Sequence, residues 1–345
     1  MKDDIERHVK ALWAAMMAGD EYAAVAGARA ALHAGVSLET MFLDVVAVAQ
    51  ARVGQDWLAN RLTVAQEHTA TAVNERVLSV LAHTQTTPDQ RSAPLKGRLT
   101  VACVDGEWHT FPARLLSEVL RLRGWRVDYL GAHVPTPHLI AQVHRTAPDT
   151  VALSGSLATR LPAAHAAITA CQAAGAPVLV GGAAFGPDGR YARLLGADAW
   201  APDARAAARL LDGGPLPRRS APGLSAGRPP HLADPEYALL TDRAADLVRD
   251  VMGELVPEKG PEGAERPGHT AEDIAYIVDF LRAAVYVDDP DLFTSFIGWM
   301  ARMLTERDVP ARALVTDLEA MEDRLTDLPH ALGDLARARA MLPSG

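Results

Sequence analysis

The chain has 345 residues, a formal net charge of −9 and two cysteines, Cys103 and Cys171. At roughly 150 residues per domain, this length predicts two or three domains, each with its own core. The acidic balance argues against a large surface for nucleic-acid phosphates, and no helix-turn-helix or basic arm is evident. Neither a signal peptide nor a membrane-spanning apolar run is visible, and two thiols among apolar residues fit a reducing compartment, so we expect a cytoplasmic protein.

Residues 1–88 predict a four-helix bundle. Apolar residues recur at helical spacing in the first segment and again near 20–34, 38–60 and 64–84. Thr63, followed three residues later by Gln66, is a capping box that opens the fourth helix. Four amphipathic helices with short links are typical of a bundle.

Residues 97–213 predict a Rossmann-like α/β domain with a doubly wound parallel sheet. Short apolar runs alternate with amphipathic segments, and the runs read LTVACV, RVDYLG, TVALSG, PVLVGG and ADAWAP. Ligands of such sheets bind beyond the carboxyl ends of the strands. We therefore expect functional residues in the loops that follow these runs.

Residues 214–233 are rich in Pro, Gly and Ser and predict a linker. Residues 234–345 predict a helical domain, with helices at about 235–255, 270–286, 290–307, 310–326 and 328–341, and Thr270 as an N-cap. The expected fold class is thus α/β plus all-α: a bundle, a parallel-sheet domain and a C-terminal helical domain.

The loop after the first predicted strand places Glu107 two residues before His109. A carboxylate that accepts a proton from the far nitrogen of an imidazole fixes its tautomer and raises its basicity toward a metal. A lone histidine in a surface loop is nevertheless more often unspecialised. Two further stretches bear on the choice: Ser154-Gly155-Ser156-Leu157 after the third strand and Gly181-Gly182 after the fourth.

Together these stretches resemble the cobalamin-binding fold, whose signature is DxHxxG, a serine-containing motif and a GG pair in this order. The resemblance implies that His109 is the lower axial ligand of cobalt, with Glu107 behind it. It also implies that the nucleotide tail runs along Ser154, Ser156, Leu157, Gly181 and Gly182, where small residues leave room. Glu107 departs from the usual Asp, and Pro112 replaces the Gly, which puts the turn into the next helix in question.

A second pattern lies in the predicted bundle, where Trp57 is followed after nine residues by Glu67 and His68. The short link at 60–63 should bring all three to one end of the bundle. By itself, a tryptophan on an apolar helix face usually belongs to the core. The Wx9EH pattern resembles the adenosylcobalamin-dependent photoreceptors, in which the tryptophan packs on the adenosyl group and the Glu-His pair contacts it.

The same resemblance has a departure that limits the mechanism. The photoreceptors that control carotenoid genes have a histidine directly after the tryptophan, and it captures cobalt after illumination; here the residue is Leu58. His68 or water is therefore the expected upper ligand after photolysis. No counterpart of the DNA-binding module of those repressors is visible, so we expect a different output and no direct contact with nucleic acid.

Six of the eighteen aromatic residues lie between 276 and 299. Core packing explains such a cluster, and a flat conjugated ligand is the alternative. The arrangement is similar to that of photocobilins, which pair a cobalamin module with a biliverdin-binding region. The resemblance implies biliverdin held without a thioether, by stacking and by Arg or His contacts to its propionates. The candidate contacts are His269, Tyr276, Phe280, Arg282, Tyr286, Phe296, Trp299 and Arg302, with His330 and Phe293 as further candidates.

The expected function is that of a light sensor rather than an enzyme. Adenosylcobalamin would be gripped between the bundle and the α/β domain, and loss of the adenosyl group in light would change domain or subunit packing. We expect a light-dependent homo-oligomer or a protein partner, and no membrane. The alternatives are a corrinoid protein of a methyltransferase system, which Wx9EH disfavours, and a cobalamin storage or delivery module. A mutase is disfavoured because no substrate barrel of about 250 residues is visible.

Overall fold

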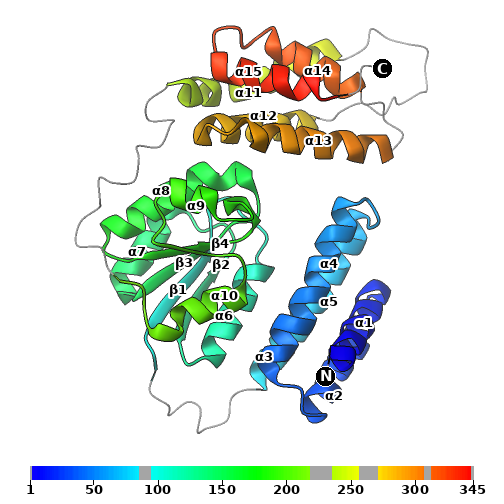
Figure 1. The fold of residues 1–345 in the computed structure, drawn as a ribbon, viewed down its shortest axis with the longest axis vertical. Coiled ribbons are helices and arrows are strands. Elements are labelled where there is room, and N and C mark those ends of the chain that lie inside the picture. The colour runs from blue at the N-terminus through cyan, green and yellow to red at the C-terminus, as the bar shows by residue number, and fades with distance from the viewer. Residues whose placement is uncertain (1, 85–94, 218–234, 256–270, 307–311, 343–345) are drawn as a thin grey trace. The chain divides into compact units, whose positions relative to one another are not determined.

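The computed structural model describes residues 2–84, 95–217, 235–255, 271–306 and 312–342. The chain forms two compact units, residues 1–223 and 224–345. The bundle and the α/β domain both lie in the first unit (Figure 1). Among the described residues, no helix combines the length and the apolar character needed to cross a membrane.

The bundle is built from four helical segments, as the sequence predicts. They are α1 (Lys2–Ala18), α2 (Glu21–His33), a long segment made of α3 (Leu38–Thr40), η1 (Met41–Val46) and α4 (Ala47–Leu58), and α5 (Val64–His83). The capping box of α5 is confirmed, because Thr63 Oγ1 accepts from Gln66 N at 3.2 Å and Gln66 Oε1 accepts from Thr63 N at 2.9 Å. The long segment differs from the expected plain α-helix, since η1 is a turn of π-helix.

The α/β domain contains a five-stranded parallel sheet with the order β2-β1-β3-β4-β5. The strands are β1 (Arg98–Cys103), β2 (Arg126–Gly131), β3 (Thr150–Ser154), β4 (Val178–Gly181) and β5 (Ala199–Ala201). The helices are α6 (Phe111–Leu122), α7 (Thr136–Thr146), α8 (Leu161–Ala173), α9 (Arg190–Leu194) and α10 (Ala204–Leu210), with short 3₁₀ turns η3 (Ala158–Arg160), η4 (Ala183–Phe185) and η5 (Leu211–Gly213). This confirms the predicted fold class.

The strand order reverses between β1 and β3, which are neighbours in the sheet. The chain leaves β1 toward β2 on one side and returns to β3 on the other. Such a switch point opens a crevice at the carboxyl ends of the two strands, where ligands of this architecture bind. The loops that carry Glu107-His109 and Ser154-Leu157 follow these two strands.

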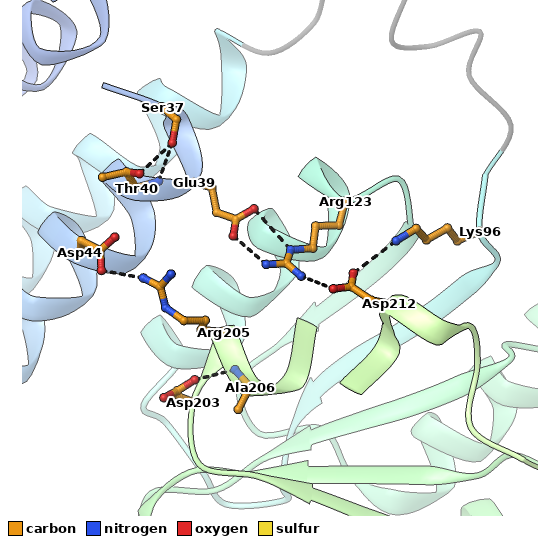
Figure 2. A network of polar contacts seen from close by, with 10 residues as sticks. All are labelled: Ser37, Glu39, Thr40, Asp44, Lys96, Arg123, Asp203, Arg205, Ala206 and Asp212. Carbon is orange, nitrogen blue, oxygen red and sulfur yellow. Dashed lines mark hydrogen bonds and ion pairs between the residues drawn. The ribbon is translucent and has the colours of Figure 1, made fainter. Parts of the chain in front are cut away.

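The bundle is joined to the α/β domain by a shared apolar core. Ion pairs also join the two, as Figure 2 shows. Arg123, the C-cap of α6, binds Glu39 Oε1 through Nη2 at 2.7 Å and Asp212 Oδ2 through Nη1 at 2.6 Å. Arg205 on α10 binds Asp44 of the π-helical turn at 2.6 Å. Two carboxylates of the long helical segment are therefore fixed to α6 and α10. We call these contacts the ionic clasp: Glu39, Asp44, Arg123, Arg205 and Asp212.

The second unit contains, within its described residues, five helices around an apolar core. They are α11 (Glu236–Leu255), α12 (Ala271–Val287), α13 (Pro290–Glu306), α14 (Arg312–Glu322) and α15 (Pro329–Ala340). Glu236 is 2% exposed and accepts from the main-chain nitrogens of His330 and Ala331, at 3.0 and 2.6 Å, in the first turn of α15. The predicted N-cap Thr270 and most of the predicted linker lie outside the described residues.

Candidate cofactor-binding site

Glu107 and His109 form a hydrogen-bonded pair in the loop after β1. The Glu107 carboxylate is fully buried, and its Oε1 accepts from His109 Nδ1 at 2.5 Å and from His109 N at 2.9 Å. Gly106 precedes the pair with φ +77°, a conformation that favours glycine. The carboxylate thus fixes the direction of the imidazole.

The other ring nitrogen of His109 points away from this carboxylate. The His109 side chain is 57% exposed, and Nε2 has no hydrogen-bond partner among the residues that the structure describes. With Nδ1–H donated to Glu107, the Nε2 lone pair is available to a metal. One imidazole supplies a single ligand, so a metal held here must bring its other ligands with it, as cobalt in a corrin ring does.

The charge state of the pair follows from its contacts. Burial alone would raise the pKa of Glu107, but hydrogen bonds from His109 and Ser156 lower that pKa to about 2. The hydrogen bond from Glu107 raises the pKa of His109 above 6.5, against the effect of burial, and the Glu67 carboxylate adds to the rise. Glu107 is therefore ionised and makes the imidazole a stronger donor.

The second oxygen of Glu107 holds the serine loop. Oε2 accepts from Ser156 N at 2.6 Å and from Leu157 N at 3.1 Å, while Ser154 is buried at the end of β3. One carboxylate therefore ties the loop of β1 to the loop of β3. The two predicted motifs lie together, and they are joined through the main chain of Ser156 and Leu157.

The glycine pair after β4 lies against the same serine loop. Gly155 N donates to Gly181 O at 3.0 Å, and Ala184 N donates to Gly155 O at 3.1 Å. Gly182 has φ +100°, and a β-carbon there would lie 2.2 Å from Gly155 O. The backbone alone thus demands glycine at 182. Its predicted contact with a nucleotide tail stays a prediction.

Pro112, the departure from the DxHxxG pattern, lies in the first turn of α6. The amide hydrogen that proline lacks has no intrahelical acceptor at this position, and the fixed φ suits a helix start. The substitution therefore leaves the entry into α6 intact.

The bundle places the Wx9EH residues at one end of α4 and α5. Trp57 lies in the last turn of α4 with 37% exposure, and Glu67 lies in the first turn of α5, where it accepts from Thr71 Oγ1 at 2.8 Å. His68 is 70% exposed, with Nε2 at 3.6 Å from Glu67 Oε2. The structure thus brings the three residues to the end of the bundle predicted from the sequence.

Helix α5 lies along the His109 loop. The charge of Glu67 acts on the His109 imidazole, and Glu75 accepts from Thr110 Oγ1 at 3.3 Å. The acidic residue of Wx9EH therefore lies close enough to the histidine of the sheet for its charge to raise the pKa of that histidine.

Sequence reasoning missed two residues around this loop. His133, in the loop after β2, accepts from Gly106 N at 2.9 Å and stacks on the exposed Trp108 ring, with centroids 5.0 Å apart. The Arg160 guanidinium packs against Gly106. Both follow strands at the same edge of the sheet, and this position was the one signal that could have found them.

The aromatic candidates of the second unit fall into two groups. Phe280 and Phe296 stack at 3.8 Å with an interplanar angle of 5°, and Trp299 lies 5.9 Å from Phe296. Tyr286 and Phe293 are buried in the helical core, as core packing predicts.

The polar candidates for biliverdin binding in this unit differ in their exposure and in their contacts with other residues. Arg282 binds Asp279 at 2.9 Å and Thr241 at 3.2 Å, so its charge is partly used within the unit. Tyr276 and Arg302 are exposed. His269 lies outside the described residues.

Comparison with known families agrees with this geometry. Residues 97–211 match a family described as B12 binding domain, and residues 9–82 match a second family with the same description. The Methanosarcina barkeri monomethylamine corrinoid protein has a similar fold, with a TM-score of 0.52 and 19% identity over 60% of this chain and 98% of that chain. The fold and the site therefore define a cobalamin-binding protein.

Among curated proteins, the chain is similar to two repressors of Myxococcus xanthus. It is 37% identical to the HTH-type transcriptional repressor CarA over 35% of this chain and 41% of the relative, and 37% identical to CarH over 41% of this chain and 47% of the relative. It is also 35% identical, over 35% of its length, to 30% of a Xanthomonas oryzae protein named UDP-N-acetylglucosamine--N-acetylmuramyl-(pentapeptide) pyrophosphoryl-undecaprenol N-acetylglucosamine transferase. The chain spans less than half the length of these relatives.

Proposed function

We propose that this protein is a cytoplasmic light sensor, not an enzyme, that binds adenosylcobalamin through His109 and biliverdin through its second unit. The observation that carries the cobalamin part is the Glu107–His109 pair, which leaves the exposed Nε2 of His109 available to cobalt while the charge of Glu67 of the bundle acts on the same imidazole. A corrin ring bound by His109 would present its upper face to the end of α4 and α5. Similarity to CarA and CarH supports the regulatory assignment.

Bound adenosylcobalamin supplies a cobalt–carbon bond that light cleaves. Residues of this chain would hold the corrin ring and respond to the loss of the adenosyl group. Glu107 keeps His109 in the ligating tautomer, and Trp57 provides an apolar surface for the adenosyl group. When this surface loses its partner, the balance between bundle positions shifts, and the ionic clasp and shared core determine how far the bundle moves.

Leu58 cannot take a place in the cobalt coordination sphere after illumination. Its apolar side chain is 51% exposed next to Trp57. His68 is the candidate upper ligand from the bundle, because its ring is 70% exposed at the same end.

The biliverdin part of the proposal is supported by the aromatic cluster in which Phe280 stacks on Phe296 and Trp299 lies tilted beside Phe296. Both cysteines of the chain are buried in the α/β domain, so the second unit would bind the tetrapyrrole without a thioether bond. A light-dependent homo-oligomer or an output protein would receive the signal.

A corrinoid carrier for methyl transfer is the second candidate, since the fold resembles that of a corrinoid protein. A methyl carrier must expose its upper face to partner enzymes. The exposed, acidic end of α5 and the Trp57 surface suit a larger upper ligand better.

The deciding experiment loads the full chain in darkness with adenosylcobalamin and biliverdin, removes free ligand, and records spectra and size-exclusion profiles before and after illumination. We expect a retained cobalamin spectrum that changes in light, a retained red-absorbing bilin band and a changed elution volume. The His109→Ala variant is the control for the lower ligand. Preferential retention of methylcobalamin would favour the carrier, and cobalamin without bilin would remove the second chromophore from the proposal.

A further inference from the structure

Arg160 lies at the carboxyl ends of β1 and β3, where the loops that follow these two strands meet. It ends η3, three residues after Leu157 of the serine loop, and is the N-cap of α8. A β-carbon at Gly106 would lie 3.0 Å from Arg160 Cζ and 3.0 Å from Nη1, so the guanidinium covers this glycine. Arg160 therefore bridges the loop that carries His109 and the loop that Glu107 binds.

The charge of this guanidinium is not balanced by a nearby acid. Arg160 is half-buried, its Nε is buried without a hydrogen-bond partner, and no carboxylate of the described ranges lies within ion-pair distance of it. The two acids of the loop that it covers lie against other groups: Glu107 binds His109 and the serine loop, and Asp105 Oδ1 lies 3.1 Å from His133 Nδ1.

A buried donor of this kind without an acceptor is unfavourable, so an acceptor supplied by a ligand would be stabilised there. The N-terminus of α8 adds positive potential at the same place, because no side chain caps its first main-chain N–H groups. A positive group of this kind, set at a ligand-binding edge, is suited to an anionic group of the ligand.

We propose that Arg160 binds the phosphodiester of the nucleotide loop of cobalamin and so selects corrinoids that carry this phosphate. The proposal rests on the cobalamin binding proposed above and is independent of light sensing. The amide side chains of the corrin ring are neutral, so the phosphodiester is the anion of the ligand. A guanidinium offers two parallel N–H donors to the two free phosphate oxygens.

The test compares three corrinoids that carry progressively less of the nucleotide loop. Adenosylcobalamin carries phosphate and base, adenosylcobinamide phosphate carries the phosphate without the base, and adenosylcobinamide carries neither. Dissociation constants are measured in darkness on the full chain for wild type, Arg160→Gln, Arg160→Lys and the control Arg209→Gln. Arg209 is an exposed cation on α10 and matches the change in net charge.

We expect Arg160→Gln to weaken binding of the two phosphate-bearing ligands about tenfold to a hundredfold, the size of a lost charge-assisted hydrogen bond. Binding of adenosylcobinamide should be unchanged. Arg160→Lys should recover part of the lost affinity, because lysine keeps a positive charge. Arg209→Gln should bind all three ligands with the affinity of wild type. Thermal unfolding of each variant separates a binding loss from a folding defect, and Arg160→Lys carries the test if the glutamine variant does not fold.

An equal loss for all three ligands, or no loss for any, would overturn the role of Arg160 while leaving cobalamin binding intact. A free anion is the other ligand that Arg160 could bind. This role is indicated, and the proposed one overturned, if inorganic phosphate raises the melting temperature of ligand-free wild type but not of Arg160→Gln, while both proteins bind each corrinoid with the same affinity. Failure of wild type to bind any of the three would overturn the proposed function as well.

Discussion

Glu107 is bound to His109 through one carboxylate oxygen and to the main chain of Ser156 through the other, at 2.5 and 2.6 Å. The residue that orients the proposed cobalt ligand is therefore also the residue that joins two loops of the sheet. Binding and local folding are coupled at this carboxylate.

Replacing Glu107 by Gln should weaken cobalamin affinity about 10–100-fold, because the imidazole loses its charged partner and its preferred tautomer. The measurement is a spectroscopic titration of hydroxocobalamin. In the His109→Ala background the same replacement should have little further effect, since the ligand it supports is gone. Additive losses in the double variant would mean that Glu107 acts through the serine loop instead.

Cobalamin affinity should fall as the pH drops through the raised pKa of His109. Below that pKa, which lies above 6.5, Nε2 carries a proton and cannot ligate cobalt. Each pH unit below it should cost about tenfold in affinity, and the profile should be flat above it. Equilibrium titrations between about pH 5 and pH 9 test this, with His109→Ala as the variant that should lose the slope.

The stability of the ligand-free protein has its own pH signature from the same pair. The raised pKa of His109 contributes stability that is complete below 6.5 and lost as pH rises through the folded-state pKa. The lowered pKa of Glu107 contributes stability present above 4.5 and lost as pH falls toward 2. Urea unfolding of Glu107→Gln should lack the acid-side loss of wild type.

Trp57→Ala should reduce the preference for adenosylcobalamin over hydroxocobalamin. Burying one face of an indole ring against adenosine contributes about 1–2 kcal/mol, so roughly a tenfold change in the affinity ratio is expected. Paired titrations in darkness provide the ratio. Tyr22→Ala, a change at an 81%-exposed aromatic of α2, is the control. An unchanged ratio would remove Trp57 from the adenosyl surface.

Arg123→Gln should loosen the bundle on the α/β domain. It removes both the Glu39 and the Asp212 contacts of the ionic clasp, and these charges are only partly exposed. The free energy of unfolding should drop by about 1–2 kcal/mol, and hydrogen exchange should rise in α3 and at the end of α6. Arg193→Gln, which breaks a solvent-exposed pair with Asp188, should change neither.

Asp334→Asn should stabilise the second unit at neutral pH. Burial raises the pKa of Asp334 from 3.8 to about 6, so its ionised form is disfavoured in the folded state. Stability is therefore lost as pH rises from 3.8 through about 6, and the neutral amide should recover about 1–3 kcal/mol above that range. Hydrogen exchange in α15 should slow at about pH 8 but not at about pH 4, with α8 as the internal reference.

The strand runs, the helix periods and the capping box at Thr63 were sufficient to predict the fold, because each reflects local burial or local hydrogen bonding. The Glu107-His109 pair was also predictable, since the two residues are close in sequence. Arg160 and His133 were not, because their roles depend on which loops meet at the switch point. The π-helical turn was hidden for a different reason: its residues have an ordinary helical pattern.

That π-helical turn connects two functional ends of one continuous helical segment. Glu39 of the ionic clasp precedes it and Trp57 follows it, so the turn sets the rotation of one relative to the other. Deleting one residue of α4, outside the wide turn, would rotate Trp57 by about 100° relative to Glu39, whereas deleting one within 41–46 would restore a regular helix and change that rotation little. Chain length in α4 is therefore under a constraint that side-chain chemistry does not reveal. Substitutions at its surface should be tolerated where insertions and deletions are not.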